Sequence, residues 1–131
     1  MNEINISIKG RNMKLTEAVE DYARKKVDSL RKVITADEEA GIFAQVELGK
    51  EVRDQMSGDI FVATIDLDIA GEVHHVEVEQ SDLYAAIDEM KDEISRVVRN
   101  YQKKKRDLTR RGSLKMKEDL RDPLKQESEE D

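Results

Sequence analysis

The chain lacks several residue types that define whole classes of protein. Its 131 residues include no cysteine, no tryptophan and a single proline, Pro123, and aromatic residues make up only 4%. The missing cysteines exclude a disulfide scaffold and any metal site built on thiolate ligands. No apolar run approaches the roughly 20 residues that a helix needs to cross a bilayer, so no membrane partner is expected. The first residues also lack the basic-then-apolar pattern of a secretory signal peptide, and we therefore expect a cytoplasmic protein.

The charges are numerous and unevenly distributed. Charged residues make up 40% of the chain, and the formal net charge is -7. Residues 37–81 carry two bases against twelve acids, whereas residues 1–36 carry eight bases against five acids. The asymmetry is sharpest over residues 94–112, where eight bases face a single acid, Asp107. Two basic segments thus flank an acidic middle, and a negative total does not exclude a polyanionic partner that binds one side of the molecule.

Four segments alternate apolar and polar residues with the period of two that is typical of a strand with one buried face. These segments are residues 4–8, 42–48, 61–69 and 74–78. A turn-rich stretch over residues 54–59 separates the second segment from the third. The polar positions of the last three segments are often acidic, so we expect a sheet with one apolar face and one wet, acidic face.

Two further segments repeat apolar residues at spacings of three and four, which is typical of a helix with one buried stripe. The first runs from an N-cap at Thr16 to about Val33, and the second begins at an N-cap, Asp82. Its apolar stripe reaches Tyr101, and a basic stretch follows that we expect to extend the helix into solvent. From Gly112 onward the sequence shows no periodicity, so a disordered or ligand-ordered tail is predicted there.

The element order is therefore β-α-β-β-β-α. Each helix has one apolar stripe and the sheet has one apolar face, so both helices are predicted to cover the same face. The fold class is α+β, a two-layer sandwich with a four-stranded mixed sheet, because a right-handed crossover makes the first two strands parallel. Residues 1–108 are predicted to form this domain, and residues 109–131 a basic-to-acidic flexible tail or linker.

Helices packed on one face bring the two basic segments together in space. Lysine and arginine side chains on such a surface bind phosphates without reading sequence, and structured RNA is recognised largely through its shape and backbone. The run from Lys103 to Arg106 is the strongest signal, because four consecutive like charges repel one another and no acid four residues earlier offsets them. The pattern predicts a polyanion-binding surface from the following residues: Arg24, Lys25, Arg31, Lys32, Lys91, Arg96, Arg99 and Lys103–Arg106, with Arg110 and Arg111 beyond them.

Evidence for catalysis is weaker. His74 and His75 are neighbours on one strand, so they point to opposite faces and cannot readily chelate one ion. Asp66 and Asp68 share a strand face and leave a metal-dependent hydrolase as an alternative. The sequence has no glycine-rich phosphate loop and no nucleophile arrangement, so we expect a protein that is not an enzyme, with no cofactor, no bound metal and no small-molecule substrate.

Four segments carry a further signal: Ile6–Met13, Leu15–Ala18, Tyr22–Lys26 and Val76–Asp88. They resemble the ribosome hibernation promoting factor family, which includes the ribosome-associated inhibitors and is often labelled sigma-54 modulation protein. The likeness extends from residue 1 to about residue 107. The resemblance implies a β-α-β-β-β-α fold, similar in outline to double-stranded-RNA-binding domains. It also implies that Tyr84 and Ala86 support the fold rather than bind a ligand.

For function, the resemblance implies a ribosome hibernation factor. Members bind the small ribosomal subunit (30S) and its rRNA, also within the 70S ribosome, at the mRNA channel and the A- and P-site tRNA positions. They thereby inhibit translation in stationary phase or stress. Carried over to this chain, the implied RNA-binding residues are the helical ones Arg24, Lys25, Arg31, Lys32, Lys91, Arg96, Arg99, Lys103, Lys104, Lys105 and Arg106, together with Lys9 and Arg11 at the end of the first strand.

Two questions stay open at this level. Long members of the family add a second small β domain that pairs ribosomes, and the segment after Gly112 is too short for one. The chain is thus either a short form with an acidic tail or the N-terminal part of a long form, and ribosome dimerisation is undecided. A general double-stranded-RNA-binding protein or RNA chaperone is the alternative function.

Overall fold

The computed structural model describes residues 3–35, 41–51 and 59–121, with side chains described as far as Gly112. Most of the predicted turn at 54–59, and residues 122–131 of the predicted tail, lie outside the described residues.

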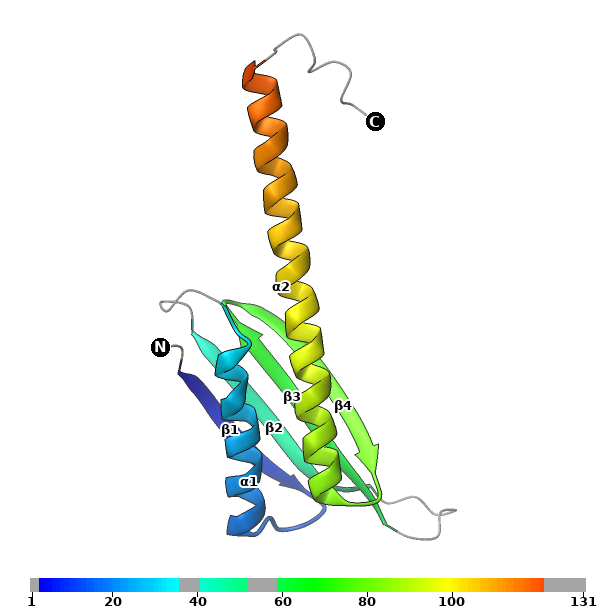
Figure 1. The fold of residues 1–131 in the computed structure, drawn as a ribbon. Coiled ribbons are helices and arrows are strands. Elements are labelled where there is room, and N and C mark those ends of the chain that lie inside the picture. The colour runs from blue at the N-terminus through cyan, green and yellow to red at the C-terminus, as the bar shows by residue number, and fades with distance from the viewer. Residues whose placement is uncertain (1–2, 36–40, 52–58, 122–131) are drawn as a thin grey trace. The chain divides into compact units, whose positions relative to one another are not determined.

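The elements follow the predicted order along the chain (Figure 1). They are β1 (Ile4–Arg11), α1 (Glu17–Asp28), a 3₁₀ turn η1 (Ser29–Lys32), β2 (Ile42–Glu51), β3 (Ile60–Ile69), β4 (Glu72–Gln80) and α2 (Leu83–Arg121).

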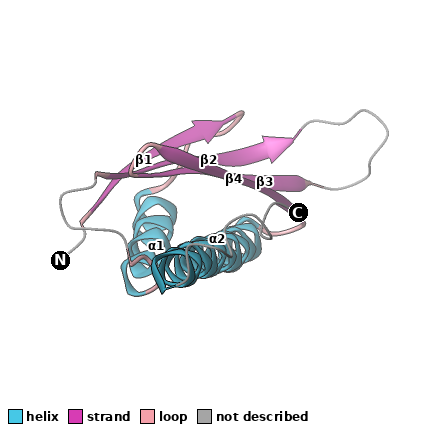
Figure 2. Cartoon of the chain, turned by 90° about the horizontal axis from the view of Figure 1, so that it is seen from above, coloured by secondary structure: helices cyan, strands magenta, loops and turns pink. Residues whose placement is uncertain are grey.

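The four strands form one sheet in the order β1-β2-β3-β4. Strands β1 and β2 are parallel because α1 crosses between them, whereas β2, β3 and β4 pair antiparallel. Both helices lie on the same side of this sheet (Figure 2). The predicted two-layer α+β sandwich with a mixed sheet is therefore confirmed.

Both helices begin where their side chains predict. The Thr16 hydroxyl accepts a hydrogen bond from the Val19 amide at 3.2 Å, and the Asp82 carboxylate accepts one from the Ala85 amide at 2.9 Å. Each cap satisfies a backbone N–H that the first helical turn leaves without a partner. The end of the first helix differs slightly from the prediction, because the α-helix ends at Asp28 and the next four residues tighten into η1.

The core lies between the helices and the inner face of the sheet. Its fully buried large side chains come from every layer and include Leu30, Ile42, Leu48, Ile65, Leu67, Ile87, Met90 and Ile94. These are the apolar positions of the predicted strand alternations and helix stripes, so the burial follows the sequence periodicity.

The predicted disordered or ligand-ordered tail does not begin at Gly112, because α2 continues to Arg121. Residues 113–121 contain no proline and no β-branched residue, and most of them are good helix formers such as Leu, Lys, Met and Glu. One interior glycine costs only about 1 kcal/mol relative to alanine. The helix ends just before Pro123, which cannot continue it and restricts the residue before it.

The chain divides into two compact units, residues 1–99 and residues 100–131, and the division falls within α2. The predicted domain boundary after residue 108 lies in the second unit and stays a prediction. Across the described part of the chain, no helix is long and apolar enough to cross a membrane.

Candidate nucleic-acid interface

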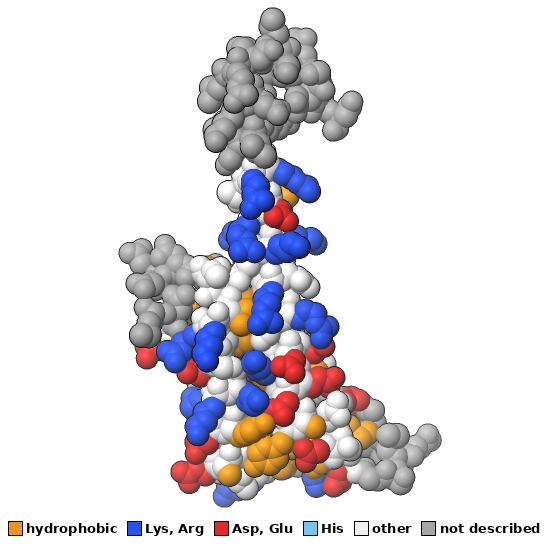
Figure 3. Space-filling model, viewed as in Figure 1, with side chains coloured by type: hydrophobic (Ala, Val, Ile, Leu, Met, Phe, Trp, Pro, Cys, Tyr) orange, Lys and Arg blue, Asp and Glu red, His pale blue; other side chains and the backbone are white. Residues whose placement is uncertain are grey.

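Basic side chains gather on the helical side of the first unit. Figure 3 shows them over α1 and α2, on the face that the helices present to solvent. We call the following residues the helical cation surface: Arg24, Lys25, Arg31, Lys32, Lys91, Arg96 and Arg99. All are exposed except Lys91, whose side chain is 27% exposed. Two basic segments that are far apart in the sequence thus share one side of the sheet, as predicted.

Two of these cations are held by a carboxylate one turn earlier on their own segment. The Arg31 guanidinium lies 2.9 Å from the Asp28 carboxylate, and that of Arg96 lies 2.7 Å from the Glu93 carboxylate. Exposed pairs of this kind stabilise a helix by only about 0.3–0.5 kcal/mol. A phosphate group can therefore replace either carboxylate at small cost.

Other members of the helical cation surface have no close carboxylate in the described part of the chain to neutralise their charge. Among the described residues, Lys25, Lys32 and Arg99 have no carboxylate within ion-pair distance, and Lys91 approaches Asp92 only at 4.0 Å. A cation without a neighbouring carboxylate gives its full positive potential to solvent and to any polyanion that approaches. These residues are therefore the strongest candidates for phosphate contacts.

Arg24 lies at the margin of the surface. Its guanidinium donates a hydrogen bond to the Ile6 carbonyl of β1 at 3.4 Å. Because β1 is an edge strand of the sheet, this contact occupies a backbone carbonyl that would otherwise face solvent. Arg24 thus has a structural role at the sheet edge in addition to its charge.

The second unit contains the remaining predicted cations, Lys103, Lys104, Lys105 and Arg106, all exposed on α2. Successive helical residues are turned by about 100°, so four in a row point around the helix rather than to one side. Lys105 also lies 5.8 Å from the centre of the Tyr101 ring. Such an arrangement suits contacts with a phosphate backbone more than recognition of one base.

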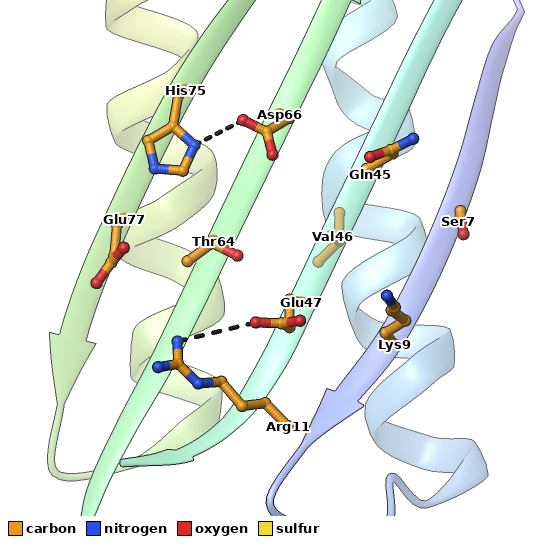
Figure 4. Close-up of a pocket in the computed structure, with 10 residues that line it drawn as sticks. All are labelled: Ser7, Lys9, Arg11, Gln45, Val46, Glu47, Thr64, Asp66, His75 and Glu77. Atoms are coloured by element: carbon orange, nitrogen blue, oxygen red, sulfur yellow. Dashed lines mark hydrogen bonds and ion pairs between the residues drawn. The ribbon is translucent and has the colours of Figure 1, made fainter.

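The structure does not bring Lys9 and Arg11 to the helical cation surface. Strand alternation turns Ile6 and Ile8 toward the core and places these two cations on the opposite, open face of the sheet. The Arg11 guanidinium lies 3.8 Å from the Glu47 carboxylate (Figure 4). It also lies 3.3 Å from the Glu51 carboxylate. The two residues, to which the resemblance assigns a role in RNA binding, thus lie on the opposite side of the sheet from the helical cation surface.

The open face forms a shallow polar concavity of ≈ 410 Å³ (Figure 4). Its acidic lining residues are Glu47, Asp66 and Glu77, and the His75 ring nitrogen Nδ1 lies 2.6 Å from an Asp66 oxygen. The carboxylates outnumber the two cations here, so this face repels phosphate. The open sheet face is therefore acidic, whereas the helical side of the first unit carries as many acids as bases and differs by its exposed cations that have no neighbouring carboxylate among the described residues.

The hydrolase alternative receives no support from this geometry. Asp66 contacts His75, and Asp68 accepts a hydrogen bond from the Gly71 amide at 2.9 Å in the turn between β3 and β4. His74 and His75 lie on opposite faces, as predicted, because they are adjacent in one strand. Within the described ranges, no three His, Asp or Glu side chains cluster closely enough to hold a metal ion.

A junction that joins the two helices was not predicted from the sequence. The Tyr22 hydroxyl of α1 donates a hydrogen bond to the Asp88 carboxylate of α2 at 2.5 Å. The Lys26 ammonium lies 3.3 Å from the same carboxylate and 5.5 Å from the centre of the Tyr22 ring. Tyr84 packs edge-to-face on Tyr22, with ring centres 4.9 Å apart. The sequence feature that could have indicated this junction is a spacing of four residues in each helix, between Tyr22 and Lys26 in α1 and between Tyr84 and Asp88 in α2. This spacing places each pair on one face of its helix.

The junction changes two pKa values. The hydrogen bond to Asp88 raises the pKa of Tyr22 above its ordinary 10.0, since ionisation would place two negative charges together. The same carboxylate raises the pKa of Lys26 above 10.5 because it stabilises the ammonium. Tyr22 is therefore neutral and Lys26 charged throughout the physiological range.

Comparison with known proteins identifies the family of this chain. The family model described as sigma 54 modulation protein / S30EA ribosomal protein matches residues 6–106. The chain belongs to this family. The resemblance seen in the sequence is thereby confirmed, and this S30EA-family protein is assigned to a class of ribosome-associated factors.

Two solved structures share the fold of this S30EA-family protein. One is the N-terminal domain of Thermus thermophilus Protein Y, which is 32% identical with a TM-score of 0.57 and covers 77% of this chain and 99% of its own. The other is a ribosomal subunit interface protein from Coxiella burnetii, 13% identical with a TM-score of 0.59, covering 75% of this chain and 97% of its own. The second likeness is one of fold only.

Proposed function

We propose that this protein is a hibernation factor that binds the small ribosomal subunit and its rRNA, alone or in the 70S ribosome, and inhibits translation in stationary phase or stress. The proposed site is the decoding region, where the protein would occupy the mRNA channel and the A- and P-site tRNA positions. Family membership and the 32% identity to the Protein Y domain support this proposal.

The observation that carries the proposal is the separation of charge between the two faces. The helical cation surface lies on one side of the sheet, and Glu47, Asp66 and Glu77 lie on the other. An RNA surface attracts the first and repels the second, so the bound protein has only one favourable orientation. A net charge of -7 is compatible with tight RNA binding for this reason.

The form of the helical side suits structured RNA. Two helices packed side by side on a sheet present a convex layer, and side chains on such a layer reach phosphates and 2′-hydroxyls rather than bases in a narrow groove. This mode requires positioning and charge but no reaction, so we propose a binding function without catalysis or cofactor.

Co-sedimentation of the full chain with purified 30S subunits at moderate salt tests the proposal. The triple variant Lys25→Glu, Lys32→Glu and Arg99→Glu is expected to bind at least about tenfold more weakly and with a smaller salt dependence. Absence of binding by the unchanged protein, or full binding by the triple variant, would contradict the proposal.

A matched pair of single variants controls for total charge. Lys25→Glu on the helical cation surface and Lys9→Glu on the open sheet face change the net charge equally. We expect the first to weaken binding and the second to leave it nearly unchanged. Equal loss in both would show that net charge, rather than the helical side, governs binding.

Competition with free duplex RNA separates this function from that of a general double-stranded-RNA binder. A hibernation factor is expected to stay on 30S subunits in the presence of excess duplex. A general binder would be displaced in proportion to the duplex added.

A further inference from the structure

An aromatic patch lies on the helical side. Tyr84 is one of the few large apolar side chains that the described residues expose, with 40% of its surface accessible. Figure 3 shows an apolar patch over α1 and α2, bordered by both acidic and basic side chains. The family resemblance implied a fold-supporting role for Tyr84, but a side chain exposed to this degree does more than fill the core.

The junction fixes the position of this ring. Tyr22 and Tyr84 pack edge-to-face with an interplanar angle of 77°, an arrangement that cannot cover both faces of both rings. The Tyr22 ring is held in turn by its hydroxyl, which is bonded to Asp88. Tyr84 is thus a rigid aromatic surface that is partly open to solvent.

The charges nearby favour an RNA ligand over a cationic one. The carboxylate nearest to the ring pair, Asp88, is already compensated by the Lys26 ammonium at 3.3 Å and the Tyr22 hydroxyl at 2.5 Å. The Lys26 ammonium lies 5.5 Å from the centre of the Tyr22 ring. Lys25 and Lys91 supply further positive charge on the same helical side, which also carries the acids Asp21 and Asp92. An exposed aromatic ring on a surface that carries cations is an arrangement that binds unpaired nucleobases, with the ring stacking on the base and the cations contacting its phosphates.

We propose that Tyr84 stacks on an unpaired base of the small-subunit rRNA and that Tyr22 and Asp88 position it for this contact. The proposal rests on the proposed function and names one base-binding site within it. It predicts that one rRNA nucleotide is unstacked or already flipped out where α1 and α2 meet the RNA.

Substitutions at Tyr84 distinguish stacking from simple apolar contact. Tyr84→Phe keeps the aromatic ring and is expected to bind 30S subunits within about twofold of the unchanged protein. Tyr84→Leu keeps apolar bulk but has no π-face, and together with Tyr84→Ala it is expected to weaken binding about 5- to 100-fold. Full binding by Tyr84→Leu would overturn the proposal and favour an apolar contact with a ribosomal protein.

Phe43 supplies the matched control. It is an aromatic residue of similar exposure, 51%, on β2, and it is paired in register with Asp68 on the open side of the sheet. Phe43→Ala is expected to leave binding unchanged. Thermal unfolding of each variant verifies that the fold is intact. A Tyr84 variant with a lowered unfolding temperature could lose binding through unfolding alone. In that case Tyr84→Trp provides a second, direct measurement of stacking.

Fluorescence gives that direct readout because the chain contains no tryptophan. In Tyr84→Trp the single indole is expected to be quenched on addition of 30S subunits, whereas in Phe43→Trp it is expected to be unaffected. If Tyr84→Trp co-sediments with 30S subunits but its fluorescence is not quenched, the stacking proposal is overturned and the proposed function is not. Failure of the unchanged protein to bind subunits would overturn the proposed function as well.

Discussion

The Tyr22 hydroxyl and the Asp88 carboxylate join α1 to α2 by a hydrogen bond of 2.5 Å across a sequence separation of 66 residues. The Lys26 ammonium completes the junction from the same helix as Tyr22, 3.3 Å from the carboxylate. The two helices that carry the helical cation surface are therefore linked directly, as well as through the core. This link and the core fix the two helices relative to each other, so their cations form one surface.

Alkaline pH is expected to weaken this junction. Both Tyr22 and Lys26 have raised pKa values, chiefly through Asp88, so each holds its proton more tightly in the folded protein than in the unfolded chain. Their contribution to stability is complete below the ordinary values of 10.0 and 10.5 and is lost as the pH rises through the raised values. Urea unfolding between about pH 9 and about pH 11 measures this loss.

Asp88→Asn is expected to flatten that pH dependence, since it removes the main cause of both shifts. The control is Asp92→Asn, a nearby and more exposed carboxylate of the same helix, which should leave the slope unchanged. An identical slope in Asp88→Asn and the unchanged protein would show that the junction does not form in solution.

Glu93→Gln is expected to strengthen RNA binding. The substitution releases Arg96 from the carboxylate at 2.7 Å and removes a negative charge from the helical side. Because an exposed pair is worth only about 0.3–0.5 kcal/mol, the gain should be about twofold in affinity for 30S subunits at fixed salt. Glu47→Gln removes the same charge from the open sheet face, where it lies near Arg11, and is expected to have no effect. Weaker binding by Glu93→Gln would contradict the assignment of Arg96 to the interface.

Gly49→Ala is expected to destabilise the sheet. A Cβ atom at Gly49 would overlap the Arg11 carbonyl oxygen of the neighbouring parallel strand, so the backbone itself must shift. Overpacking of this kind costs about 1–3 kcal/mol, measured as a lower urea midpoint. An unchanged midpoint would mean that β1 is not paired with β2 at this position.

Gly112→Ala is expected to stabilise α2. A Cβ atom there meets no other atom within 4 Å, and alanine is favoured in a helix over glycine by up to about 1 kcal/mol. Far-ultraviolet circular dichroism should show increased helix content. No increase would show that α2 does not continue through this position in solution.

The local elements could be predicted from the sequence because their causes are local. Thr16 and Asp82 are caps whose side chains bond to amides three residues later, and the strands follow from the alternation of apolar residues. The alternation of Ile6 and Ile8 also predicts that Lys9 faces away from the helices. Its implied place in the RNA site came from the family resemblance and not from this pattern.

The end of α2 could not be predicted from periodicity. The segment beyond Gly112 has no apolar stripe, and a stripe reports packing rather than helix formation. Helical propensity without a stripe suffices for α2 to reach Arg121 in the structure.

By itself the sequence determined the strands, the helices, the shared helical side and the separation of basic from acidic segments, since these depend on periodicity and on charges that can be counted. The tertiary structure alone decided which charged side chains contact residues from other parts of the chain. It placed Arg11 among acids behind the sheet and brought Tyr22 to Asp88. Such contacts depend on distances of a few ångströms between residues far apart in the chain, and only the packing of helices on the sheet fixes those distances.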